Sequence, residues 1–203
     1  MRTRRRPELC ITPGFLLLLA VAVLVCEDGL LVCGLGAMLI HEAGHAAMLC
    51  ISGGGLARLR LTLFGGVMEP AYPLCLSPAK EAAVCLAGPG ANLLTVPLFA
   101  LAGSRSEWGY ILAGLSLSAA IFNLLPISGL DGGRALLFAM SGRPRAAEML
   151  RRLTLYAGFA LLYPGVVLLC SRFHNPTLAI FGLWAIFRAI RSDSSCEAED
   201  FRV

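Results

Sequence analysis

Charged side chains are scarce in this sequence. Asp, Glu, Lys and Arg make up only 15% of the 203 residues, whereas 57% are hydrophobic and the mean hydropathy is +0.75. A soluble domain of this length needs far more polar surface, so the composition argues against that class of protein. Several apolar runs approach the roughly 20 residues with which a helix crosses a bilayer. The sequence therefore predicts a multi-pass protein embedded in a lipid bilayer.

Paired cysteines are also lacking. The eight cysteines are irregularly spaced, contain no C-x-x-C pair, and lie mostly in apolar runs. A thiol in such a run packs as a small hydrophobic group. The pattern therefore argues against both a disulfide framework and a zinc site built from cysteine.

Six runs are expected to span the membrane, with these approximate limits: 9–26, 30–51, 79–103, 108–127, 153–171 and 174–190. The first run follows a basic start and could be a signal peptide. No small-x-small cleavage site follows it, so we expect a retained span. Residues 1–191 would form one membrane-embedded domain, and residues 192–203 a polar cytoplasmic tail.

The basic residues indicate the orientation of these spans. With the N-terminus in the cytoplasm, only Arg105 and Arg172 of the 17 Lys and Arg residues fall in outer loops. The positive-inside rule then places both termini in the cytoplasm. The net charge of +4 is explained by this topology, and no nucleic-acid partner is expected.

The predicted fold class is an all-α polytopic membrane protein with one irregular segment after the second span. Leu59, Leu61 and Leu63 alternate with more polar residues, and a period of two indicates a strand. Gly65 and Gly66 then permit a turn or bulge. Two interpretations stay open here: a re-entrant strand or loop beside a site in the membrane, and an amphipathic strand in a cytoplasmic loop.

Reactive side chains gather in the stretch HEAGH, inside the second predicted span. Residues four apart on a helix share a face, so His41 and His45 can direct their nitrogens at one Zn²⁺. Glu42 lies beside that point and can take a proton from water. The alternative is a chance pair of core histidines. Each ionisable residue at mid-bilayer costs roughly 2.5–3.5 kcal/mol, which favours the metal site.

A catalytic zinc has three protein ligands and one open position. Asp131, in the stretch GLDGGR, is the expected third ligand because it follows a span that ends in the same cytoplasmic half as His41 and His45. Glycines on both sides let the backbone turn the carboxylate toward the metal. His174, the remaining histidine, falls in a predicted outer loop and is interpreted as an ordinary loop residue.

The motifs HEAGH, FGGV, AGPGANLL and NLLPISGLDGG follow one another in the order found in the site-2 protease family of intramembrane zinc metalloproteases, peptidase family M50. The chain resembles this family over about residues 30–141, the expected catalytic core. The resemblance implies one zinc ion per chain, held at His41, His45 and Asp131, with Glu42 as the general base.

The same resemblance implies which residues contact the substrate. Asn123 and Asn92 would orient the substrate or the oxyanion, since an asparagine amide can donate to developing negative charge. Gly65 and Gly66 are also expected to contact the substrate or the oxyanion. The alternative for both asparagines is hydrogen bonding between helices.

The six-span layout most resembles the sporulation branch of the family, which implies activation of a sigma-factor precursor. Ser128 and Gly129 depart from the pattern, because many members carry proline-rich sequence there. No PDZ-like insert or nucleotide-sensing domain is recognisable. The expected partners are a membrane-associated protein substrate and membrane regulatory proteins, in a prokaryotic cell membrane.

The expected activity is hydrolysis of a peptide bond in, or near, the membrane-embedded part of a protein. One alternative is a pseudoprotease that binds metal and captures membrane helices without cleaving them; the intact chemical positions count against it. A second is a small transporter that uses the polar residues as an ion path. The single tight cluster and the lack of internal repeats count against this transporter.

Overall fold

The computed structural model describes residues 8–26, 28–62, 65–70, 76–103, 106–171 and 175–191. These residues divide into two compact units, one ending at Ile121 and the other beginning at Phe122. Some predictions lie outside the described residues: the strand position of Leu63, the outer-loop positions of Arg105, Arg172 and His174, and the tail 192–203.

The first unit begins with a strand rather than a membrane helix. Residues expected to open the first span form β1 (Glu8–Ile11), and helix α1 (Pro13–Val25) starts only after them. Thr12 caps this helix by accepting a hydrogen bond from the Phe15 N–H, and a proline at the first helical position suits its fixed φ. The expected start of the first span was therefore wrong by about one turn.

A small sheet also corrects the all-α expectation. Strands β1, β2 (Leu56–Thr62) and β3 (Gly65–Pro70) lie in the order β1-β2-β3. The β1 strand runs parallel to β2, and β2 pairs antiparallel with β3. The alternation of leucines predicted β2 correctly. The strand β1 was missed because its four residues pair with partners some 50 positions away, and such partners leave no local period.

One arginine joins the three strands at their polar face. Arg58 in β2 donates to Glu8 of β1 at 3.0 Å and to Glu69 of β3 at 3.3 Å. The hydrogen bond to Glu8, followed by the charge of Glu69, raises the pKa of the Arg58 guanidinium above its usual value. These exposed pairs fix strand order more than they add stability, because solvent screens them.

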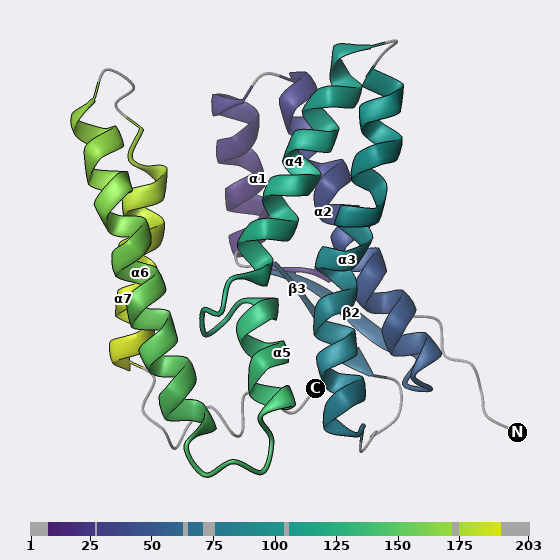
Figure 1. The fold of residues 1–203 in the computed structure, drawn as a ribbon. Helices are drawn as coiled ribbons and strands as arrows, with labels where there is room; N and C mark the ends of the chain where they lie inside the picture. Colours follow the sequence, from purple (N-terminus) through teal and green to yellow (C-terminus); the bar gives the residue numbers. More distant parts are fainter. Residues whose placement is uncertain are drawn as a thin grey trace, which may run out of the picture. The chain divides into compact units, whose positions relative to one another are not determined.

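Helices α2 (Asp28–Ile51) and α3 (Pro78–Gly103) lie side by side in the first unit (Figure 1). A Cβ placed on Gly44 of α2 would collide with the backbone of Ala87 and the methyl group of Ala91 in α3. The small residues of both helices therefore bring the two backbones together. Most of α4 (Glu107–Leu124) belongs to this unit, where the ring of Trp108 lies against Gly29.

The second unit contains α5 (Asp131–Ala139), α6 (Ala146–Cys170) and α7 (Thr177–Arg191). Helices α6 and α7 run side by side (Figure 1), with Gly158 and Gly182 at points where an added Cβ would meet the partner helix. The short α5 was not predicted. The sequence was interpreted there as a chain that dips back, because Pro126 and Gly129 end the preceding helix.

Three of the described helices are long and apolar enough to cross a membrane: Gly29–Ile51, Pro78–Gly103 and Ala146–Cys170. Helix α1 is apolar but has only 13 residues. Helices α4 and α7, of 18 and 15 residues, coincide with two more predicted spans. The chain is thus a membrane protein, whereas the number of six spans stays a prediction.

Candidate active site

The two histidines of HEAGH lie one turn apart on α2 and face each other. Their Nε2 atoms are 3.1 Å apart, and their ring centroids 4.7 Å apart. Two imidazole nitrogens on a tetrahedral zinc, each at 2.0–2.1 Å, lie about 3.3–3.4 Å from one another. The spacing of the His41 and His45 nitrogens therefore fits a shared metal ion.

The imidazole of His45 is held by α3. Its Nδ1–H donates to the backbone carbonyl of Val84 at 2.7 Å, which leaves the lone pair of Nε2 directed toward His41. A Cβ on Gly88 would collide with the same ring, so only glycine leaves room for it. A donor contact of this kind fixes the tautomer that a metal-ligating histidine needs.

The carboxylate of Glu42 is held by β3. Its Oε1 accepts the N–H of Gly66 at 2.9 Å, and the residue is only 7% exposed. A Cβ on Gly66 would collide with this carboxylate. Among the described residues, Oε2 has no hydrogen-bond partner. One oxygen is thus fixed by the sheet, and the other can accept a proton from water.

Of the residues predicted to contact the substrate, Asn92 lies against His41, a predicted metal ligand. Its side chain is fully buried, and Nδ2 lies 3.4 Å from Nδ1 of His41. Gly65 opens β3 with a φ of +126°, a conformation that favours glycine. The N–H of Gly66 is engaged by Glu42. The oxyanion role of these residues stays a prediction.

The remaining predicted residues belong to the second unit. Asp131 is the first residue of α5 and is half-buried, and Asn123 is half-buried in the last turn of α4. The loop before Asp131 is anchored, since the Ser128 N–H donates to Oγ1 of Thr154 in α6 at 2.9 Å. The parts that Asp131 and Asn123 play toward His41 and His45 remain predictions.

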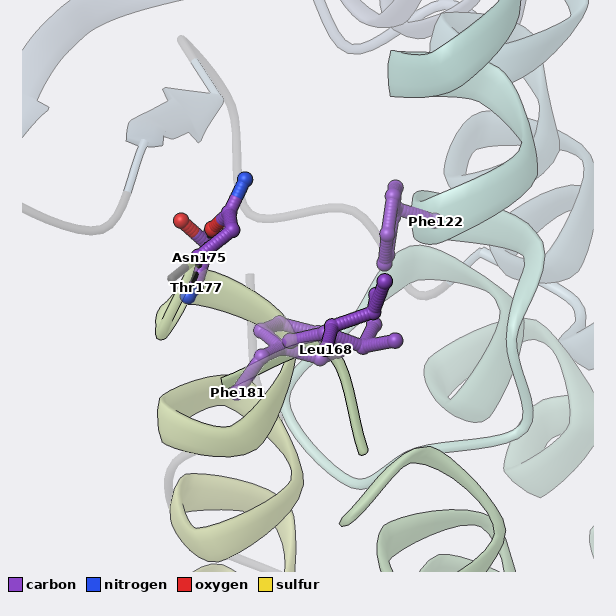
Figure 2. Close-up of a pocket in the computed structure, with 6 residues that line it drawn as sticks. Phe122, Leu168, Asn175, Thr177 and Phe181 are labelled. Atoms are coloured by element: carbon purple, nitrogen blue, oxygen red, sulfur yellow. Dashed lines mark hydrogen bonds between the residues drawn. The ribbon is translucent and has the colours of Figure 1, made fainter. Parts of the chain in front are cut away.

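The second unit also holds an apolar cavity of about 370 Å³. Figure 2 shows Phe122, Leu168 and Phe181 among the side chains around it, with Asn175 and Thr177 at one side. The rings of Phe122 and Phe181 meet edge to face, with centroids 5.4 Å apart. The described lining holds no histidine, cysteine or carboxylate, and the Thr177 hydroxyl has no base among these residues, so this cavity does not compete with HEAGH as the site of chemistry.

Two contacts at the histidines were not predicted from the sequence. The carbonyl of Val84 gives no signal in a sequence, because every residue carries one. Gly88 lies in the quoted motif AGPGANLL, and its position one turn before Asn92 could have suggested a close approach to the HEAGH helix. The fold and the paired imidazoles together define a membrane protein with two imidazoles, spaced as for a shared metal ion, on a helix long and apolar enough to cross a membrane.

Comparisons with known proteins agree with this class. The profile described as peptidase family M50 matches residues 99–164. Rip3 of Mycobacterium tuberculosis, named as a zinc metalloprotease, is 28% identical over 182 residues, which cover 79% of this chain and 44% of Rip3. Stage IV sporulation protein FB of Bacillus subtilis is 31% identical over 147 residues, covering 70% of this chain and 51% of that protein.

A solved structure shares the fold. The site-2 protease from Methanocaldococcus jannaschii superposes with a TM-score of 0.65 and 19% sequence identity, covering 94% of this chain and 93% of that one. The chain belongs to peptidase family M50 and has the site-2 protease fold. It spans about half the length of the curated relatives it matches.

Proposed function

We propose that this protein is an intramembrane zinc metalloprotease that hydrolyses peptide bonds in, or near, the membrane-embedded part of a protein substrate. The observation that carries the proposal is the arrangement on α2, where the two Nε2 atoms lie 3.1 Å apart. The buried Glu42 follows His41 by one residue, and its Oε2 has no hydrogen-bond partner among the described residues. Membership of family M50 supports the same reaction.

One zinc ion per chain would be held by His41, His45 and Asp131. The two imidazoles offer facing nitrogens on one helix, and a hard carboxylate completes a set of three ligands that is common in catalytic zinc sites. Gly132 and Gly133 let the first turn of α5 lie close against the preceding chain, because an added Cβ would collide with the carbonyls of Leu124 and Ile127. An ion bound there would polarise the scissile carbonyl and lower the pKa of a water molecule toward about 7.

Glu42 would act as the general base. The Gly66 N–H fixes Oε1 at 2.9 Å, which directs Oε2 to accept a proton from the attacking water. The same oxygen then returns the proton to the leaving amine as the peptide bond breaks. Asn123 would orient the substrate, because its amide can donate to the developing oxyanion.

The substrate would bind in extended form. A helical substrate hides its peptide bonds, so the bond to be cleaved must be locally unwound. Among the described strands, β3 is an edge strand, and its first residues Gly65 and Gly66 lie next to Glu42. Addition of a substrate strand at this edge would present a peptide bond to the site.

The cellular setting follows from the sequence pattern. We place the protein in a prokaryotic cell membrane with both termini in the cytoplasm and with six spans, because basic residues concentrate on one side. Similarity to stage IV sporulation protein FB supports a role in sporulation. The substrate that we propose is a sigma-factor precursor, and the proposed partners are membrane regulatory proteins. The alternative function is that of a metal-binding pseudoprotease.

The test compares the wild type with Glu42→Gln, each purified in detergent. We expect both to bind one zinc ion, while hydrolysis of a membrane substrate by Glu42→Gln falls by at least about 10³-fold, since the base is lost. Glu107→Gln, an exposed carboxyl-to-amide change at the start of α4, serves as the matched control. Normal turnover by zinc-loaded Glu42→Gln would contradict the base assignment.

The same preparation separates the enzyme from the pseudoprotease. Cleavage products from cells with wild type and with Glu42→Gln identify the substrate and the bond together. Zinc-loaded wild type that releases no product from any membrane protein in these cells would favour the non-proteolytic alternative.

A further inference from the structure

The amide of Asn92 is buried beside His41 and has no role in the proposed reaction. This side chain on α3 is fully buried, and among the described residues its Oδ1 has no hydrogen-bond partner. Its Nδ2 lies 3.4 Å from Nδ1 of His41. A buried amide oxygen without a partner is unfavourable, so this arrangement calls for an explanation.

This orientation of the Asn92 amide conflicts with metal binding by His41. If Nδ2 donates to His41 Nδ1, the neutral imidazole carries its proton on Nε2, the atom that faces Nε2 of His45 at 3.1 Å. A histidine that binds a metal through Nε2 needs its proton on Nδ1 and an acceptor beside that proton. As placed, Asn92 therefore offers His41 a donor where an acceptor is required.

A half-turn of the amide removes the conflict with metal binding. The oxygen and nitrogen of an asparagine amide have nearly the same shape, so the two orientations fill the same space. Rotation by 180° puts Oδ1 beside Nδ1 of His41, where it can accept the Nδ1–H, and frees the Nε2 lone pair, while Nδ2 takes the place that Oδ1 held. His45 already has the equivalent contact, since its Nδ1–H donates to the Val84 carbonyl.

We propose that Asn92 is a positioning residue for His41, accepting the Nδ1–H through Oδ1 and so presenting Nε2 to the metal. This inference rests on the proposed zinc site and deepens it. Helix α3 then orients both imidazoles, one through the backbone oxygen of Val84 and the other through a side-chain oxygen. Asn92 thereby acts on the ligand rather than on the substrate.

The test measures zinc affinity by chelator competition, with no need for a substrate. Asn92→Leu keeps the size but removes the acceptor, and we expect about 10–100-fold weaker zinc binding, the usual effect of losing such a partner. Asn92→Asp keeps an acceptor beside Nδ1, and we expect an affinity within about threefold of wild type. Ser116→Ala, another fully buried polar-to-apolar change in the same unit, should leave the affinity unchanged.

The outcomes are distinguishable. If Asn92 only joined α3 to α2, Asn92→Leu would lower the thermal stability of the zinc-free protein and leave zinc affinity at the wild-type value. That result, or equal losses of affinity in Asn92→Leu and Asn92→Asp, would overturn the inference alone. A wild type that binds no zinc would overturn the proposed function, and the role of Asn92 with it.

Discussion

At the scale of single residues, the site depends on two glycines as much as on its reactive side chains. Gly66 and Gly88 each leave the space that one reactive group occupies, the carboxylate of Glu42 and the imidazole of His45. The absence of a side chain is what lets β3 and α3 approach α2 at these two points. Alanine at Gly66 should therefore impair hydrolysis while zinc is retained, whereas alanine at Gly88 should impair zinc binding itself.

Gly66→Ala is expected to displace the Glu42 carboxylate, because the added Cβ would collide with both of its oxygens. Hydrolysis should fall by about 10²-fold or more, the range of general-base catalysis, while one zinc ion per chain is retained. Turnover and zinc content measured on one preparation check this. Loss of zinc together with activity would show that the change disturbs the ligands as well.

Gly88→Ala is expected to weaken zinc binding first. Its Cβ would collide with the His45 ring, so zinc affinity should fall by at least about tenfold and activity with it. Gly90→Ala, two residues along the same helix, is the control, since nothing lies within 4 Å of its added Cβ. Equal zinc affinities in the two variants would contradict the close approach of α3 to His45.

At the scale of elements, α6 contributes to the loop that leads to Asp131. Oγ1 of Thr154 accepts the N–H of Ser128 at 2.9 Å and donates to the carbonyl of Leu150 at 2.8 Å. Ser128 and Thr154 are both buried, with exposures of 2% and 0%. One hydroxyl thus links the start of α6 to the loop just before α5.

Thr154→Val keeps the shape and removes the hydroxyl. The buried Ser128 N–H then loses this acceptor, at a cost of about 1–3 kcal/mol, so the temperature of unfolding should fall by several degrees. Thr154→Ser, which restores the acceptor, should recover most of the loss. Thermal unfolding of the three proteins in the same detergent measures this, and equal temperatures would show that the loop does not need the anchor.

At the scale of the whole molecule, metal binding and folding should be coupled. A ligand that binds only the folded protein adds stability, about 2.7 kcal/mol when its concentration is 100 times its Kd. Removing zinc with a chelator should therefore lower the unfolding temperature of the wild type by about 5–10 °C. His45→Ala serves as the control and should show no such shift. A wild type that is indifferent to the chelator would argue against a structural contribution of the ion.

Several features of the molecule could be predicted from local patterns. The apolar runs placed both ends of α2 and α3 and the end of α6 within two residues, because a membrane helix needs a continuous apolar stretch. Helix α6 begins at Ala146, about two turns before the expected span, because its first turns are polar. The alternating leucines placed β2, since strand side chains alternate between faces. The strand β1 and the helix α5 were missed; β1 in particular is defined by pairing with β2, far along the chain.

The sequence by itself determined the membrane class, the family and the imidazole pair of His41 and His45, because composition, motif order and helical periodicity are local properties of the chain. Only the tertiary structure decided that Gly66 holds Glu42, that Val84 orients His45 and that Asn92 lies against His41. Those contacts join residues 24 to 51 positions apart, and their existence depends on how closely two backbones approach.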